Sequence, residues 1–390
     1  MTKSTTTAGV VFSACLMLYA LCLRGQTGGG YSDRGGSDSS QIELFISRPE
    51  LQHVSPSEWE KEYGKFLVQH PDNLLARYYL AGLRVQMGHV QDADADIQIL
   101  DKAGFPVSTL VQLRAQLADV VGRPQDQIAA YEKFSRPLPA NDPVVNDPSM
   151  VEAWKINSRV ASIRVLELNG KIDLADEAWH KFLKEDSNEI YYLGEYGDFR
   201  LRQGDFAGAI VAYQARLDSM PKNQPSVDVT AAAKLQFAEA LWANGKLEDA
   251  QRQASSAMKL LLQNRETSRH SSSFLPRSVF FTLVLAQREV GSADDRAMAT
   301  AALRELTATF NSDTYFEDDA LLALLADKWP KEKASAELAS TLKDAPNLQW
   351  ALWAQVYLGL GSPEAARTAV RAMHEPSVQR TILSSTFPAL

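Results

Sequence analysis

The chain has 390 residues, of which 45% are hydrophobic and 23% are charged, and its formal net charge at pH 7 is −8. This composition is typical of a folded protein with a large core and excludes a disordered chain. The acidic balance, with no basic stripe interleaved with aromatic residues, argues against a nucleic-acid partner, because phosphate binding needs clustered Lys and Arg. Both cysteines, Cys15 and Cys22, lie near the start, which excludes disulfide frameworks and cysteine-based zinc sites from the rest of the chain.

Residues 1–24 are predicted to target the protein to a membrane. The stretch between Lys3 and Arg24 carries no charge and is long enough for a signal-peptide core or for one tilted membrane span. Only Ala20-Leu21-Cys22 loosely fits a cleavage site, which favours a retained anchor over a cleaved signal. We therefore expect a protein that is anchored in a membrane by this single segment, or that is exported, for example to a periplasm, if the segment is cleaved.

Residues 25–48 are rich in glycine and serine and are predicted to form a flexible linker. Within them, "IELFI" at residues 42–46 is compatible with either a strand or a helix. The folded body is predicted to span residues 49–390. Its first helix is expected to begin at Pro56, because Ser55 can cap it and Glu58 completes a capping box. No alternating strand pattern of useful length follows, which predicts an all-α fold.

The stretch "YGDFRLRQGDFAGAIVAY", residues 196–213, shows helical periodicity twice. Apolar residues at helical spacing run up to Gln203-Gly204-Asp205 and resume at Phe206. Gly204 is expected to adopt a positive φ, which ends a helix without a side-chain penalty. Two short helices of this kind would not be stable alone in water, so each must pack its apolar face on a neighbour.

The same arrangement recurs along the chain, with a glycine between two helical patterns each time. The glycines concerned are Gly88, Gly122, Gly170, Gly204, Gly245, Gly291 and Gly361. Gly88 and Gly122 are 34 residues apart, as are Gly170 and Gly204, which is a period known for one helix-turn-helix repeat. The longer gap after Gly122 contains the proline-rich "RPLPANDPVVNDP", which is predicted not to be helical. The gap after Gly291 holds about two repeat lengths and is expected to contain a degenerate unit at residues 316–342.

Aligned on their glycines, these segments resemble the tetratricopeptide repeat (TPR) family, over nearly all of residues 56–375. The positions that carry the resemblance are Leu193, Tyr196, Gly197, Ala209, Tyr213 and Pro221 in one unit; Trp350, Trp353, Ala354, Tyr357, Ala366 and Val370 in the last; Phe237, Ala238, Leu241 and Ala250; Leu80, Ala81 and Ala93; and Leu166, Ala175 and Trp179. Arg200 and Gln127 depart from the pattern, and the unit at Gly291 carries an inserted residue.

The resemblance implies a right-handed superhelical solenoid of about seven or eight helix-turn-helix repeats. It also implies a concave groove lined by the first helix of each repeat. Carried over by register, the groove residues are Asn157, Arg164, Glu167, Tyr191, Asp198, Arg202, Leu235, Glu239, Trp242, Leu348 and Gln355. The family's clamp for the C-terminal carboxylates of chaperones needs Lys and Asn on these faces. Because Val160, Arg164, Gly194 and Asp198 stand there, a chaperone-tail receptor is not expected.

The sequence shows no recognisable catalytic motif. The six histidines, His53, His70, His89, His180, His270 and His374, lack metal-ligand spacing, and "YLGLGSPEAA" mimics a dinucleotide fingerprint without a preceding strand. Paired carboxylates such as Asp294-Asp295 and Asp318-Asp319 are interpreted as charges at helix N-termini. The loop at residues 264–277 holds Arg265, Arg269, His270 and Arg277 and could form an anion site, although a solvated loop is the simpler interpretation.

We therefore predict a non-catalytic scaffold, without cofactor or metal, that binds a peptide or partner protein in its concave groove. Two alternatives stay open. One is an assembly subunit of an export or polysaccharide-secretion machine. The other is an enzyme whose site is built from loops such as residues 264–277.

Overall fold

The structure is a computed structural model. It describes residues 38–48, 56–140, 142–185, 189–223, 225–264, 274–287, 289–308, 310, 318–348, 350, 351 and 354. Over these residues it contains sixteen α-helices, two short 3-10 helices and no strand, which confirms the all-α prediction. The predicted membrane segment and most of the last predicted repeat, including Gly361, lie outside these residues. The chain divides into two compact units, residues 1–180 and 181–390, and each is described by itself.

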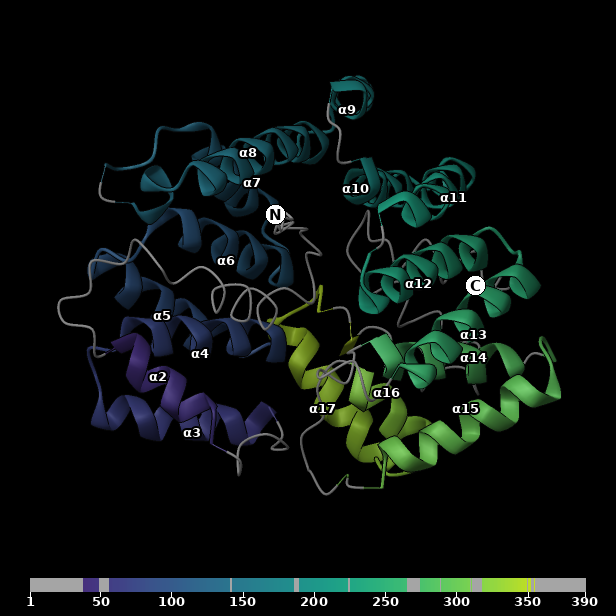
Figure 1. The fold of residues 1–390 in the computed structure, drawn as a ribbon. Coiled ribbons are helices and arrows are strands. Elements are labelled where there is room, and N and C mark those ends of the chain that lie inside the picture. The colour runs from purple at the N-terminus through teal and green to yellow at the C-terminus, as the bar shows by residue number, and fades with distance from the viewer. Residues whose placement is uncertain are drawn as a thin grey trace, which may run out of the picture. The chain divides into compact units, whose positions relative to one another are not determined.

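The first unit is built from helices that follow one another along the chain. They are α2 (Asp38–Ile46), α3 (Pro56–Gln69), α4 (Leu74–Met87), α5 (Val90–Lys102), α6 (Val107–Val120), α7 (Pro124–Glu132), the 3-10 helices η2 (Lys133–Ser135) and η3 (Pro143–Asn146), α8 (Pro148–Leu168) and the start of α9 (Ile172–Glu185). Helix α3 begins at Pro56, as predicted. Figure 1 shows α4 and α5 side by side, and α4 also contacts α6.

The predicted linker over residues 25–48 ends earlier than expected, because Asp38–Ile46 form helix α2. Ile42 and Phe45 of this helix are buried. The Phe45 ring lies 4.7 Å from that of Phe66 in α3, and Trp59 and Tyr63 surround it. The "IELFI" stretch is therefore helical. Burial of its apolar side chains stabilises the helix despite the glycine- and serine-rich sequence before it.

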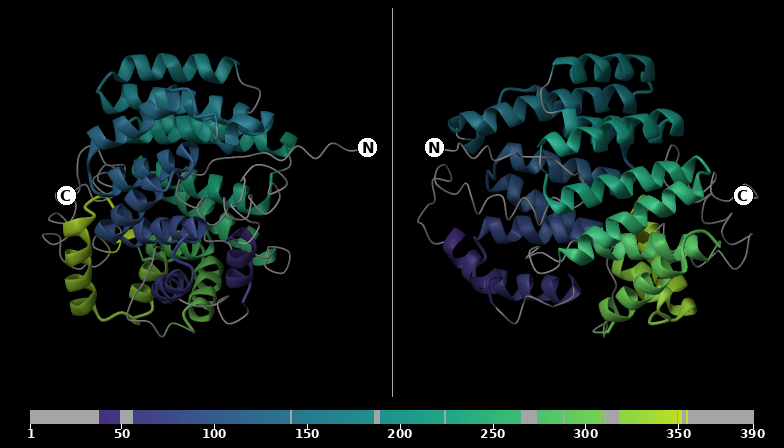
Figure 2. Two further views of the ribbon diagram at one scale, coloured as in Figure 1. Left: turned by 90° about the vertical axis from the view of Figure 1, so that its left-hand side faces the viewer. Right: turned by 45° about the vertical axis from the view of Figure 1, so that its right-hand side comes forward.

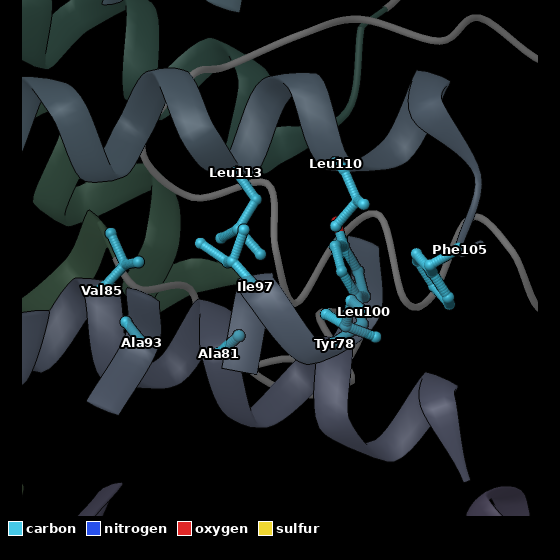
Figure 3. Close-up of a cluster of buried hydrophobic side chains, with 9 residues drawn as sticks. All are labelled: Tyr78, Ala81, Val85, Ala93, Ile97, Leu100, Phe105, Leu110 and Leu113. Carbon is cyan, nitrogen blue, oxygen red and sulfur yellow. The ribbon is translucent and has the colours of Figure 1, made fainter. Parts of the chain in front are cut away.

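The core of the first unit lies between α4, α5 and α6. Figure 3 shows Leu110 and Leu113 of α6 pointing toward α4 and α5. The side chains that meet them are Tyr78, Ala81 and Val85 of α4, Ala93, Ile97 and Leu100 of α5, and Phe105 in the turn before α6. Alanines 81 and 93 are fully buried, and their small size lets α4 and α5 approach closely. The small residues that the repeat pattern placed at these two positions are thus part of the core.

The proline-rich segment between α7 and α8 is held against the first unit. Most of it is not helical, as predicted, but Pro143–Asn146 form one 3-10 turn that was not predicted. Asp142, which is buried, accepts hydrogen bonds from the Ser108 amide (3.0 Å) and hydroxyl (2.7 Å) at the start of α6. It also accepts one from the Val144 amide, at 3.2 Å. The Asp142 carboxylate therefore caps both α6 and η3.

The second unit continues the pattern of paired helices. They are α10 (Glu189–Arg202), α11 (Phe206–Asn223), α12 (Val227–Ala243), α13 (Leu247–Gln263), α14 (Phe274–Ala286), α15 (Ala293–Leu306), α16 (Asp318–Leu325) and α17 (Lys331–Asp344). We call the earlier member of each pair the first helix of its hairpin. Each of α10 to α14 packs on the next helix along the chain, and the first helices α10, α12, α14 and α16 also contact in succession. Figure 2 shows α10 to α13 lying one upon another.

One turn closes most of these hairpins. At Gly204 (φ 73°) the glycine amide donates to the Leu201 carbonyl at 2.9 Å, and the Asp205 amide donates to the Arg200 carbonyl at 2.9 Å. This pair of bonds defines a Schellman motif, which satisfies carbonyls at a helix end. Gly88, Gly122, Gly170 and Gly245 make the same pair of bonds with positive φ. The predicted role of these turn glycines is confirmed.

Two turns place a residue other than glycine in this role. At the end of α14 the bonds are made by Glu289 (φ 63°) and the following amide, so Gly291, although its φ is also positive, is not the capping residue. Gly291 lies in the turn between α14 and α15, as predicted, but the Schellman bonds are made two residues earlier. Between α16 and α17 the residue is Asp327 (φ 51°), which lies inside the predicted degenerate unit and 34 residues before Gly361.

Candidate functional site

The candidate site is a row of polar side chains on three consecutive first helices of the second unit. It consists of Asp198 of α10, Gln236 and Glu239 of α12, and Arg277 of α14, and we call it the polar row. The Gln236 amide nitrogen lies 3.3 Å from a carboxylate oxygen of Asp198. Glu239 forms an ion pair with Arg277 at 3.7 Å. The row thus connects one hairpin to the next along the side where first helices meet.

Hydrogen bonds from side chains of α11 fix the orientation of the polar row. The Tyr213 hydroxyl donates a hydrogen bond to Asp198, and the Arg216 guanidinium donates one to the side-chain oxygen of Gln236. Arg216 is buried and fits because residue 194 has no side chain: a Cβ there would lie 2.7 Å from the Arg216 Nη1. These contacts hold the amide of Gln236 with its nitrogen toward Asp198 and its oxygen toward Arg216.

Electrostatics keep Tyr213 in its neutral, donating form. Burial raises the pKa of its hydroxyl well above the ordinary value, and the negative charges of Asp198 and Glu239 raise it further. A neutral phenol can donate to a carboxylate, whereas a phenolate would repel it. Tyr213 and Gln236 together contact both carboxylate oxygens of Asp198, which fixes the direction of this side chain.

The polar row combines carboxylate, amide and guanidinium groups that are partly exposed. The side chains of Glu239 and Arg277 are 15% and 25% exposed. Groups of this kind, held in place by neighbours, can form hydrogen bonds and ion pairs with the backbone and side chains of a peptide. The arrangement can therefore recognise a peptide by hydrogen bonds and ion pairs. Its four residues include no nucleophile paired with a base.

Some predicted groove residues of α10 and α12 fall in or near this row. Asp198 and Glu239 belong to it, and Arg202 lies one helical turn after Asp198, partly exposed. Tyr191 is a residue of α10, but its side chain lies outside the described part of the structure, as does Gln355 altogether.

Three other predicted groove residues are core residues instead. Trp242 is 1% exposed, and its ring packs edge-on against Phe281 of α14 at 5.3 Å. Leu235 and Leu348 are also buried. The repeat register places these residues on first helices, but it does not say which side of each helix the next hairpin covers. We therefore do not include Leu235, Trp242 or Leu348 in the candidate site.

The predicted residues of α8 belong to the first unit and are described apart. Arg164 forms an ion pair with Glu167, one helical turn later, and Glu167 is buried. Asn157 is partly exposed on the same helix. The ion pair holds both charged groups along their own helix.

Sequence reasoning missed two members of the row. Gln236 follows Leu235 directly, and an assignment one residue further along the helix would have found it. Arg277 was assigned to a loop over residues 264–277, but α14 already begins at Phe274, so Arg277 is helical. Residues 265–273 of that loop lie outside the described residues, and its predicted anion site stays a prediction.

Of the six histidines, His53, His270 and His374 lie outside the described residues, and the other three have structural partners. His89 contacts Glu60 at 3.0 Å, the His70 ring lies 4.6 Å from that of Phe66 in a tilted arrangement, and His180 lies 3.7 Å from Asp176. Asp294 and Asp295 lie in the first turn of α15, as expected of charges at a helix N-terminus. Asp318 is the first residue of α16, so the same prediction is confirmed there.

Searches of the described residues and of known proteins add no further assignment. Over the described ranges, no cluster of three or more His, Cys, Asp or Glu side chains could hold a metal ion. None of the helices in that part of the chain is both long and apolar enough to cross a membrane. No known protein family matches the sequence, and no curated protein matches it significantly.

Proposed function

We propose that this protein is a non-catalytic scaffold for protein–protein interaction. In this proposal its hairpins form a right-handed superhelical solenoid similar to that of TPR proteins. The polar row on the first helices binds a peptide or a partner protein. The proposal extends the all-helical fold to an arrangement, a partner class and a role.

The observation that carries the proposal is the contact between successive first helices. In the second unit these contacts join α10 to α12, α12 to α14 and α14 to α16, while the second helices α11 and α13 each also pack on the first helix that follows. Stacked hairpins of this kind bury each other's apolar faces and leave an extended surface along one side. Extended surfaces formed by repeats are used mainly for binding other chains.

The character of the polar row also favours binding. Arginine and aromatic side chains most often dominate the binding energy of protein interfaces. Arg202 lies on α10, one turn after Asp198, and Arg277 on α14 pairs with Glu239 of α12, which gives the first helices charges of both signs. A face with this pattern selects a partner by complementary charge and hydrogen bonding.

A comparison of two double variants tests the proposal. Tyr191→Ala with Arg202→Ala removes two side chains from the first helix α10. Gln214→Ala with Asp218→Ala removes an exposed pair, joined by a 2.8 Å hydrogen bond, from α11 of the same hairpin. We expect the first pair to weaken capture of the main partner from native lysate at least about tenfold, or about 1.4 kcal/mol. The second pair should leave capture unchanged, and neither should move the thermal midpoint.

Equal loss of capture from both double variants would contradict a site on the first helices. Unchanged capture from both, with loss on substitution in residues 264–277, would move the site to that loop. A hydrolase activity that depends on the same loop would support the enzyme alternative.

We also propose that residues 1–24 hold this scaffold at a membrane. Deletion of residues 1–24 should release a folded chain into the soluble fraction, since the long uncharged stretch is removed. The mass of the mature N-terminus distinguishes a retained anchor from a cleaved signal. Recovery of the truncated chain in the carbonate-resistant membrane pellet would contradict the proposal.

A further inference from the structure

A cluster of three basic side chains lies on the first unit. It consists of Arg114 on α6, Lys133 in η2 and Arg136 at the end of η2, and we call it the basic cluster. Helix η2 packs on both α6 and α8, which brings these segments together. The chain as a whole is acidic, with a net charge of −8, so a local excess of positive charge stands out against the rest.

The segment that carries Lys133 and Arg136 is fixed by packing. Phe134 between them is buried, and its ring stacks on Trp154 of α8 at 4.5 Å. The Arg136 amide donates to the Lys133 carbonyl at 3.2 Å, closing a tight turn. In a 3-10 turn, residues three apart lie on one side, so the two basic side chains start from the same side of η2.

Arg114 supplies the third charge. Its Nη2 lies 2.8 Å from a carboxylate oxygen of Asp101 on α5, and the Asp101 side chain is largely exposed. Its Nε is buried and makes no hydrogen bond to any described residue. One of the two donor edges of this guanidinium is therefore held by Asp101, while the Nε donor is unused.

The charges of the cluster are not balanced. Burial lowers the pKa of Lys133, and the charge of Arg114 lowers it further; Asp101 raises this pKa by a smaller amount, and Arg136 lowers it by the least. Asp101 forms its ion pair with Arg114, and no ion pair of Lys133 or Arg136 occurs within the described ranges. Holding like charges together costs free energy, which a bound anion relieves.

We infer that the basic cluster is a binding site for a phosphate monoester dianion, supplied either by a phosphorylated side chain of a protein or by a free phosphate. Two negative charges match the excess of two positive charges. Tetrahedral oxygens can accept hydrogen bonds from guanidinium and ammonium groups at the same time. The site is independent of the proposed scaffold role, because it lies on different helices.

Nuclear magnetic resonance of the full chain tests the inference, with the Arg114 Nε–H signal as the reporter. Inorganic phosphate is titrated at constant ionic strength, with sodium chloride as the matched control, and a short phosphoserine peptide forms a second arm. We expect a saturable shift of the Arg114 signal with phosphate, none with chloride, and a rise in the pKa of Lys133 on binding. Tighter binding of the peptide would identify a phosphorylated protein as the source; equal or weaker binding would identify free phosphate.

Two variants keep the test specific. Lys133→Gln should weaken phosphate binding about tenfold, because one charged donor is lost, and Lys133→Arg should restore it. Arg123→Gln is the matched control, since Arg123 is an exposed arginine of the same hairpin that pairs with Asp126 at 3.8 Å. A shift that is equal in chloride and phosphate, or an affinity that Lys133→Gln leaves unchanged, would overturn the inference.

Discussion

The ring of Tyr213 in α11 lies directly against Gly197 in α10. A Cβ atom at position 197 would come within 2.6 Å of the Tyr213 Cε1 atom, which is closer than such atoms approach in proteins. The hydroxyl of the same tyrosine then reaches Asp198, the next residue of α10. One aromatic side chain thus sets the distance between two helices and orients a member of the polar row.

This contact predicts that Gly197→Ala destabilises the protein. The added methyl group must displace the Tyr213 ring, which is fully buried. We expect a loss of about 1–3 kcal/mol in the free energy of unfolding, measured in urea. Gly64→Ala in α3 is the matched control, because its Cβ would meet nothing within 4 Å. There alanine should stabilise the helix by about 0.5–1 kcal/mol. A Gly197→Ala variant as stable as the wild type would contradict the account of this hairpin.

Ala209→Trp should be destabilising for the same reason. Ala209 in α11 is completely buried, so a large ring has no space between α10 and α11. We expect a loss of about 1–3 kcal/mol or more, read from urea unfolding curves. Ala207→Trp provides the comparison, because Ala207 is exposed on the same helix. If both variants were equally stable, Ala209 would not be a packing residue.

The capping turns predict that two substitutions change the free energy of unfolding in opposite directions. Gly204 adopts φ 73° and Glu289 adopts φ 63° in equivalent turns. A side chain in this conformation costs about 1–2 kcal/mol. Gly204→Ala should therefore lower the free energy of unfolding by about 1 kcal/mol, and Glu289→Gly should raise it by about 0.5–1 kcal/mol. Thermal and urea unfolding measure both changes, and destabilisation by Glu289→Gly would show that the glutamate side chain matters more than the backbone.

A buried carboxylate in the first unit joins two arginines. Asp96 of α5 is 3% exposed and accepts hydrogen bonds from Arg77 (2.8 Å) and Arg84 (2.7 Å) of α4. Asp96→Ala leaves both cations without this partner and should cost about 3–5 kcal/mol. Asp126→Ala, which breaks the exposed pair with Arg123, should cost at most about 1 kcal/mol. Similar losses from the two variants in urea unfolding would contradict the role given to Asp96.

Glu60 and His89 predict a pH dependence of the same unit. The hydrogen bond from His89 lowers the pKa of Glu60 from 4.5 to about 2, with Arg84 contributing, and Glu60 raises the pKa of His89 above 6.5. A lowered carboxyl pKa gives stability that is present above pH 4.5 and is lost as pH falls toward 2. A raised histidine pKa gives stability that is present below pH 6.5 and is lost as pH rises through the folded value.

The contribution of this pair is therefore largest between pH 4.5 and 6.5. We expect His89→Gln to lower the free energy of unfolding by about 1 kcal/mol in that range and by less at pH 8 and at pH 2.5. Urea unfolding at several pH values measures the difference between variant and wild type. A difference that does not change with pH would mean that the ion pair contributes nothing.

The hairpins could be predicted from the sequence because their signals are local. Helical periodicity and a turn glycine such as Gly204 reflect the conformation of a few neighbouring residues. The cap at Asp327 was not found, because aspartate also tolerates positive φ and leaves no glycine to align. Its distance of 34 residues from Gly361 was the only available signal.

The candidate site was predicted only in part, because its geometry depends on contacts between hairpins. Asp198 and Glu239 were identified from the repeat register. Trp242 was misplaced because burial depends on α14, whose position the register does not give. The contact of Gln236 with Asp198 joins residues 38 positions apart, and no local pattern marks it.

The most direct test of the proposed scaffold role is site-specific photo-crosslinking in the native cell. A photoreactive amino acid is placed at Arg202, on the first helix of one hairpin, or at Val211, which is 69% exposed on the second helix. If the first helices bind the partner, the probe at position 202 gives one dominant crosslinked protein and the probe at position 211 does not. Crosslinking of the same protein from position 211 and not from position 202 would contradict the proposal.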